Sequence, residues 1–333
     1  MMTPNLVLLG AGRIGEVHGT NIARHPRARV HSVVDVDRGR AEALAAKLSS
    51  RAVPDAETAV ADPAADAVLI CTSTDTHVEM IELAASSRKP VFCEKPIDLD
   101  LARVDRCLER VGAAGVPLFI GFNRRFDPHF GALKDALLRG ELGRIELLKI
   151  TSRDPQPPPP AYVKVSGGIF RDMMIHDLDM ARFLLAEEPV EVHSVGSCLV
   201  DPEIGRAGDV DTAVVVMRTA AGTLCVIDNS RRAVYGYDQR IEAFGEKGMI
   251  AAGNPAPTTL TRATAGGVLS DKPPWFFLER YAEAYRAELD HFLDVLDGRA
   301  SPLIDGRDGR AALVLADAAA RSLAEGRPVK VGA

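Results

Sequence analysis

The chain has 333 residues, of which 47% are hydrophobic and 26% charged, and its formal net charge is -6 at pH 7. This length and hydrophobic fraction suffice for two domains with buried cores and exclude a disordered chain. The acidic balance argues against a nucleic-acid-binding surface, which needs clustered, uncompensated lysine and arginine.

Membrane and export signals are missing from the sequence pattern. No apolar run approaches the roughly 20 residues that a bilayer requires. The N-terminal apolar run ends at Gly10 and follows no basic segment, unlike a signal peptide. We therefore expect a cytoplasmic protein. The cysteines lack CxxC spacing, and we expect core residues rather than disulfides or zinc ligands at Cys71, Cys93, Cys107, Cys198 and Cys225.

The N-terminal third alternates short apolar runs with amphipathic stretches. The runs, which we expect to be strands, are residues 6–9, 30–34, 67–71, 91–93 and 118–120. Continuous apolar strands separated by helical patterns indicate a parallel sheet covered on both faces. Residues 1–122 are therefore predicted to form a doubly wound α/β domain of the Rossmann type.

A glycine-rich loop, Gly10-Ala11-Gly12-Arg13-Ile14-Gly15, follows the first strand directly and precedes a helical stretch. Such a loop lets the backbone approach a pyrophosphate at the N-terminus of a helix. Asp35 stands at the end of the second strand, about 20 residues on, where a ribose-binding acid is expected. Together with Asp37 it should repel a 2′-phosphate, which favours NAD over NADP, although Arg38 leaves NADP open.

Lys95 ends the strand at 91–93, within Glu94-Lys95-Pro96. Open α/β sheets bind ligands at this edge. A lysine there can hydrogen-bond a reacting oxygen and ease the deprotonation of an alcohol. The alternative is a solvated loop lysine. The sequence leaves open whether the Lys95–Pro96 peptide is cis.

Residues 123–333 show a different pattern and are predicted to form an α+β domain with a large, mostly antiparallel sheet. Its expected strands are residues 145–151, 190–200, 211–218, 223–230, 240–244 and 249–252, with hairpin turns at 220–222 and 245–248. The proline-rich residues 154–160 should form a stiff extended loop, either a spacer or a docking site. Helical spacing at 275–296 and 306–325 predicts two helices that pack back on the first domain.

A helix is also predicted from about Gly168. On an ideal helix Asp172, His176 and Asp179 fall within an arc of about 60° and share one face. Two alternatives are an exposed i,i+4 acid and histidine pair, and a metal site. We expect no metal, because no further histidine or cysteine stands at ligand spacing.

In this order the motifs resemble the glucose-fructose oxidoreductase/inositol dehydrogenase family, also called the Gfo/Idh/MocA family, over essentially the whole chain. The resemblance rests on the glycine loop with His18, on Glu94-Lys95-Pro96, and on residues 121–127 and 167–179. Residues 151–155, 166–179 and 229–238 look most like its inositol 2-dehydrogenase members.

The resemblance implies an NAD-dependent dehydrogenase that acts on a CH–OH group, with oxidation of myo-inositol to 2-keto-myo-inositol (scyllo-inosose) expected first. It implies Lys95, Asp172 and His176 as catalytic residues, with His176 accepting the hydroxyl proton and Lys95 positioning the oxygen. Positions that line the polyol site in relatives match Arg125, Asp154 and Tyr235, for which surface ion pairs and strand packing are the alternatives.

Other activities fit the same family. They are oxidation of another inositol isomer or sugar, a redox-neutral reaction with retained NAD, and a non-catalytic nucleotide sensor. The expected cofactor-binding residues are Gly10, Gly12, Arg13, Ile14, Gly15, Asp35, Arg38, Thr72, Ser73, His77, Glu94 and Lys95. Relatives are often tetramers built through the antiparallel sheet, so we expect a homotetramer with a small-molecule substrate and no nucleic-acid or membrane partner.

Overall fold

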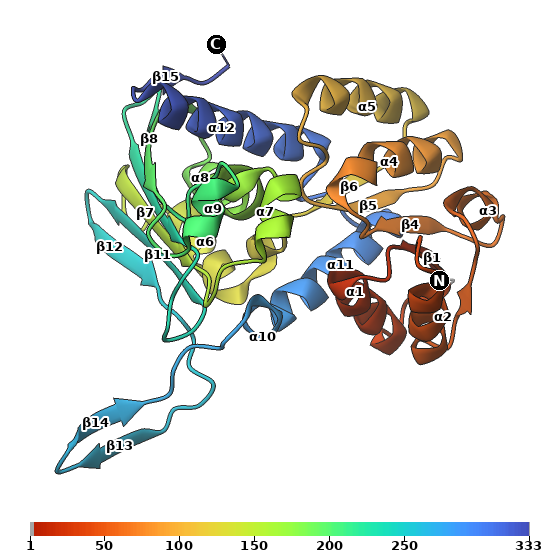
Figure 1. The fold of residues 1–333 in the computed structure, drawn as a ribbon, viewed down its shortest axis with the longest axis horizontal. Coiled ribbons are helices and arrows are strands. Elements are labelled where there is room, and N and C mark those ends of the chain that lie inside the picture. The colour runs from red at the N-terminus through yellow and green to blue at the C-terminus, as the bar shows by residue number, and fades with distance from the viewer. Residues whose placement is uncertain (1–2, 333) are drawn as a thin grey trace. The chain divides into compact units, whose positions relative to one another are not determined.

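The computed structural model describes residues 3–332, which form two compact units (Figure 1). The first unit extends to Asn123 and includes Tyr285–Ala311. The second comprises Arg124–Ala284 and the residues from Ala312 onward. Residues 285–311 therefore cluster with the N-terminal unit. The sequence placed one boundary after residue 122 and expected the helices at 275–296 and 306–325 to pack back on the first domain.

The first unit contains a six-stranded parallel sheet with the order β3-β2-β1-β4-β5-β6. Its strands are β1 (Asn5–Leu9), β2 (Arg29–Val34), β3 (Arg51–Ala52), β4 (Ala67–Ile70), β5 (Val91–Glu94) and β6 (Leu118–Gly121). Its first helices are α1 (Arg13–Arg24), α2 (Arg38–Lys47), α3 (Ala56–Ala61), α4 (His77–Ser86) and α5 (Leu101–Ala114). The chain order reverses between β1 and β4, which makes the carboxyl ends of these two strands the expected ligand edge. The predicted Rossmann-type sheet is confirmed.

Helix α11 (Ala282–Leu296) is held in the first unit by aromatic contacts. Phe292 packs edge-on against Phe92 and Phe119, with ring centroids 5.6 and 5.9 Å apart. Phe92 and Phe119 themselves stack at 5.2 Å on neighbouring strands β5 and β6. All three rings are buried, and such pairs add about 0.5–1.5 kcal/mol each beyond their buried area.

The second unit contains a seven-stranded sheet with the order β12-β11-β7-β10-β9-β8-β15. Its strands are β7 (Ile145–Arg153), β8 (Pro189–Ser197), β9 (Thr212–Thr219), β10 (Leu224–Ser230), β11 (Asp238–Gly245), β12 (Gly248–Ala252) and β15 (Val329–Lys330). All neighbouring pairs are antiparallel except β7 and β10, which run parallel. This confirms the predicted, mostly antiparallel sheet.

The hairpin of β13 (Thr261–Thr264) and β14 (Gly267–Ser270) was not predicted. It projects from the seven-stranded sheet of the same unit (Figure 1). Both strands are exposed along their whole length, so they bury no face. The alternation of buried and exposed residues, on which strand prediction depends, is therefore missing here.

The helices of the second unit include α6 (Pro128–Leu138), α7 (Pro160–Ser166), α8 (Ile175–Leu185), α9 (Pro202–Arg206) and α10 (Phe277–Arg280). The predicted extended loop ends one residue early, because Pro160 starts α7, a position that suits the fixed φ of proline. The helix predicted at 275–296 is two helices, α10 and α11. The helix predicted at 306–325 is α12 (Gly306–Glu325). None of the helices in the described residues is long and apolar enough to cross a membrane.

Candidate active site

The glycine loop connects β1 to α1 and requires glycine at two positions. Gly10 has φ +99°, and a Cβ there would lie 2.4 Å from the carbonyl oxygen of Cys71. A Cβ on Gly15 would lie 2.0 Å from the carbonyl oxygen of Gly10. Gly12, the N-cap of α1, is different, because its Cβ would meet no atom within 4 Å. The loop is thus closely packed on its protein side and open at Gly12, at the start of a helix, as a phosphate cradle requires.

Asp35 is fixed by backbone donors from both sides. Its Oδ2 accepts a hydrogen bond from the Ala11 amide at 2.6 Å, and its Oδ1 accepts one from the Asp37 amide at 2.8 Å. The carboxylate therefore stands beside the glycine loop in a defined orientation. Arg38 lies at the start of α2, where its exposed side chain donates to Glu42 at 2.7 Å.

The loop after β4 carries Thr72 and Ser73, and His77 begins α4. Thr72 accepts a hydrogen bond from the Thr76 hydroxyl at 2.8 Å. The buried ring of His77 contacts the carbonyl oxygens of Pro96 through Nδ1 (2.8 Å) and of Thr72 through Nε2 (3.1 Å). Burial lowers the pKa of His77, although these two carbonyl contacts oppose the shift. His77 thus ties the loop after β4 to the loop after β5.

Lys95 follows β5, and its peptide bond to Pro96 is cis, which the sequence left open. The side chain of Lys95 is half-buried. Glu94 is buried and contacts Nε2 of His18 on α1 at 2.6 Å. This contact joins β5 to the helix that follows the glycine loop. Glu94, expected to bind the cofactor, therefore has a structural partner in this unit.

Asp172 lies in a π-helical turn, Phe170–Met174, directly before α8. The prediction that Asp172 and His176 lie on one ideal α-helix is therefore wrong. Hydrogen bonds in a π-turn span five residues rather than four, which changes the spacing between the two side chains. Oδ1 of Asp172 accepts a hydrogen bond from the Tyr162 hydroxyl at 2.9 Å. Its Oδ2 lies 3.3 Å from both Nη atoms of Arg231. His176 is the second residue of α8 and is half-buried.

Asp154 comes directly after β7 and is half-buried. Burial raises its pKa from 3.8 to about 6, and the charge of Arg231 partly opposes this shift while Asp172 reinforces it. Among the described residues, no side-chain or backbone donor bonds to its carboxyl group. The group is therefore suited to accept a hydrogen bond from a ligand hydroxyl.

Arg125 and Tyr235, the other residues expected to bind substrate, have protein partners. The buried Arg125 donates through Nε and Nη2 to both carboxylate oxygens of Asp179, and its guanidinium stands 5.1 Å from the ring centroid of Phe183. The Tyr235 hydroxyl donates to Asp238 at 2.6 Å and lies 3.3 Å from Nη1 of Arg153. The Arg125 ion pair is buried, unlike the surface pair left open from sequence, and Tyr235 is 38% exposed.

A buried polar network was missed by the sequence analysis. Asp177 is fully buried and accepts hydrogen bonds from Arg124 and, at 3.0 Å, from Asn229. Burial raises the pKa of Asp177, against the effect of Arg124. The available signal was the match between the adjacent arginines, 124 and 125, and the alternating aspartates, 177 and 179. Each arginine takes one of these aspartates.

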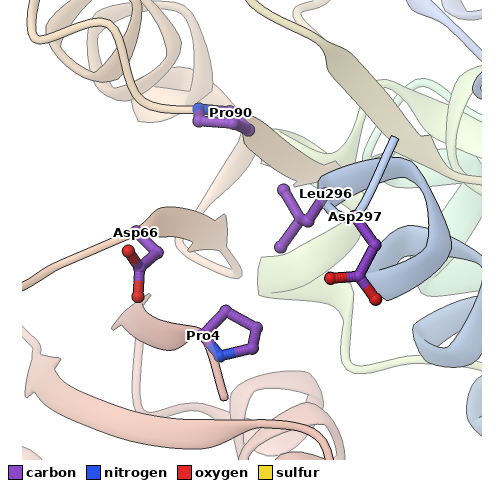
Figure 2. A pocket seen from close by; sticks show the side chains of 5 residues that line it. All are labelled: Pro4, Asp66, Pro90, Leu296 and Asp297. Carbon is purple, nitrogen blue, oxygen red and sulfur yellow. The ribbon is translucent and has the colours of Figure 1, made fainter. Parts of the chain in front are cut away.

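An open pocket of about 310 Å³ lies in the first unit but away from these residues (Figure 2). Three of its lining residues, Pro4, Asp66 and Pro90, directly precede β1, β4 and β5. Leu296 and Asp297 complete it. It therefore opens at the amino ends of the strands, opposite the edge at which such sheets bind ligands.

Comparison with known proteins agrees with this arrangement. Residues 5–122 match the family model described as "Oxidoreductase family, NAD-binding Rossmann fold", and residues 130–251 match "GFO/IDH/MocA C-terminal domain". The chain is 50% identical to the myo-inositol 2-dehydrogenase of Thermotoga maritima, covering 97% of each chain. It is also 50% identical to the inositol 2-dehydrogenase of Rhizobium meliloti, covering 99% of this chain and all of the relative.

Solved structures agree along the whole chain. The myo-inositol dehydrogenase of Corynebacterium glutamicum has a TM-score of 0.96 at 42% identity, and 100% of each chain is covered. The scyllo-inositol dehydrogenase of Lactobacillus casei, solved with NAD(H) and scyllo-inositol, has a TM-score of 0.93 at 28% identity, with 99% of this chain and all of that one covered. The chain belongs to the GFO/IDH/MocA family of oxidoreductases.

Proposed function

We propose that the protein oxidises a cyclic polyol at one CH–OH carbon with NAD, and that myo-inositol, converted to 2-keto-myo-inositol, is its first substrate. The observation that carries the proposal is 50% sequence identity, over nearly the full length, to two relatives named as inositol 2-dehydrogenases. The residues that the resemblance implies for proton transfer, Lys95, Asp172 and His176, are all present.

The first unit fits NAD. The open backbone at Gly12 suits the pyrophosphate, and the fixed carboxylate of Asp35 suits the paired hydroxyls of a ribose. The same negative charge disfavours a 2′-phosphate, and Arg38 is already engaged with Glu42. When bound, the nicotinamide supplies a hydride acceptor. We therefore propose NAD rather than NADP.

The chain's own residues handle the proton. His176 accepts the proton of the substrate hydroxyl as the C–H hydrogen leaves as hydride, so the alcohol becomes a ketone. The ammonium group of Lys95 hydrogen-bonds the same oxygen and stabilises the negative charge that develops there. Asp172 is held in a fixed orientation by Tyr162 and Arg231.

Substrate hydroxyls away from the reacting carbon need acceptors. Asp154 is the strongest of the proposed substrate ligands, because no described residue donates to its carboxyl group. We also propose that Tyr235 and Arg125 shape the substrate site. Tyr235 keeps its hydrogen bond to Asp238, and Arg125 keeps its ion pair with Asp179.

We also propose a homo-oligomer that uses the outer face of the seven-stranded sheet. Large apolar side chains on five of its strands are between 41% and 56% exposed: Val195, Val216, Leu224, Phe244 and Met249. An apolar face of this kind is typical of a subunit interface. Phe244→Lys should lower the mass measured by light scattering.

A cytoplasmic location fits the five unpaired cysteine thiols.

A second candidate is oxidation of another inositol isomer, favoured by the similarity to the scyllo-inositol dehydrogenase described above. The test is NADH formation, followed by absorbance, with purified protein, NAD or NADP, and a panel of myo-, scyllo- and chiro-inositol and glucose. Turnover of myo-inositol with NAD would support the proposal. A preference for scyllo-inositol would show that this isomer, rather than myo-inositol, is the substrate. Absence of turnover across the panel, with nucleotide retained on the protein, would indicate a redox-neutral enzyme.

A further inference from the structure

Arg231 is one of the largest fully buried side chains of the protein, with 1% of its surface exposed. It follows β10, and its backbone amide donates to the carbonyl oxygen of Asp211 at 2.9 Å. Its guanidinium faces Oδ2 of Asp172 at 3.3 Å through both Nη atoms. Nη2 also lies 4.0 Å from Oδ2 of Asp209. A buried cation of this kind is retained only where carboxylates compensate it.

Two carboxyl groups besides that of Asp172 act on Arg231. Asp209 is itself fixed, since both of its oxygens accept from the Ile169 amide, at 2.9 and 3.2 Å. A Cβ on Gly168, which has φ +78°, would lie 2.8 Å from Oδ1 of Asp209, so only glycine fits beside it. Asp154 is the third carboxyl group that interacts with Arg231. The guanidinium thus pairs with two carboxylates, and its charge also acts on a third carboxyl group from another segment.

We propose that Arg231 is a positioning residue: it fixes the carboxylate of Asp172 for the proton transfer and sets the charge of the cluster formed by Asp154, Asp172 and Asp209. The inference rests on the proposed function for its catalytic consequence. The contacts of Arg231 with Asp172 and Asp209 lie within the second unit. Asp172 accepts from Tyr162 on Oδ1 and from Arg231 on Oδ2, so loss of Arg231 removes two hydrogen bonds from Oδ2.

The cluster also decides when Asp154 carries its charge. Burial raises the pKa of Asp154, and Arg231 is the largest influence that lowers it. The other charged or titratable groups that act on Asp154, or share this buried region with it, are Asp172, Arg124, Asp177, Asp209 and Tyr237. Removal of Arg231 leaves the remaining carboxylates to raise the pKa of Asp154 further. The acid limb of the activity profile should then move to higher pH.

The experiment compares Arg231→Met, which removes the charge, with Arg231→Lys, which keeps it but loses the fork of donors. Arg232→Met, at the exposed neighbouring position, is the matched control. At neutral pH, Arg231→Met should lower kcat/KM about 100-fold, the cost typical of a displaced catalytic group. Arg231→Lys should retain the wild-type acid limb with a reduced kcat. Arg232→Met should match the wild type.

A second readout needs no turnover. Carbon-13 NMR titration of aspartate carboxyl groups in the cofactor-free protein, with Asp154→Asn for assignment, should show Asp154 titrating at higher pH in Arg231→Met. The proposal would be overturned if, in Arg231→Met, both the titration of Asp154 and the acid limb of the activity profile stayed at their wild-type positions. If Arg231→Met does not fold, full kcat in Arg231→Lys would overturn it. If the wild type oxidises no polyol, the proposed function fails, and the NMR titration still decides the role of Arg231.

Discussion

Replacing Asp154 with asparagine should stabilise the protein above neutral pH while weakening substrate binding. Asparagine keeps the shape of the side chain and removes its charge. In the folded protein the pKa of Asp154 is raised from 3.8 to about 6, first by burial, with Arg231 opposing the shift and Asp172 adding to it. A charged carboxylate at this position therefore costs folding free energy, which the asparagine variant should recover.

The sign and size follow from proton linkage. Because the folded state holds this proton more tightly than the unfolded chain, the stabilising contribution is complete below the unfolded value of 3.8. It is lost as the pH rises through about 6. The difference between a pKa of 3.8 and one of about 6 corresponds to about 3 kcal/mol of folding free energy. At about pH 8 Asp154→Asn should thus have a free energy of unfolding up to about 3 kcal/mol above the wild type, and near pH 4 the two should agree.

Urea unfolding of the cofactor-free protein across this pH range measures the difference directly. Asp135→Asn, which replaces an exposed aspartate on α6 of the same unit, is the matched control and should show no such pH-dependent gain. A constant difference between Asp154→Asn and the wild type from pH 4 to 8 would refute the reasoning. The same variant should raise KM for the polyol and leave NAD binding, measured by calorimetry, unchanged.

Other predictions concern the two units separately. Lys95→Ala should lower kcat about 100-fold or more with an unchanged unfolding transition, and near-normal turnover would remove Lys95 from the mechanism. Gly10→Ala should destabilise the fold by at least about 2 kcal/mol, because of its positive φ and the contact with Cys71, as thermal unfolding would show. Gly12→Ala should fold normally and bind NAD more weakly by calorimetry; equal affinity would contradict a phosphate at Gly12. Arg124→Met leaves Asp177 buried without its guanidinium and should cost about 3–5 kcal/mol in urea unfolding, whereas a neutral effect would show that the pair is dispensable.

Much of the fold follows from local sequence. The predicted apolar runs at residues 6–9, 67–71 and 91–93 form buried parallel strands, because a strand covered on both faces is apolar along most of its length. The six strands predicted for the second sheet were confirmed, and β7 and β10 alternate buried residues with more exposed ones. The β13 and β14 hairpin escaped prediction because it has no buried face.

The candidate site divides in the same way. The sequence by itself determined the glycine loop, the position of Asp35 and the types of residue available for proton transfer, because each depends on spacing within one short segment. Only the tertiary structure decided that Asp172 lies in a π-turn, that Arg125 takes Asp179, and that Arg231 faces Asp172. Those last partners stand more than 50 residues apart in the chain. Ion pairing and desolvation depend on which segments fold together, so the partner of a buried charge and the pKa of Asp154 cannot be read from local pattern.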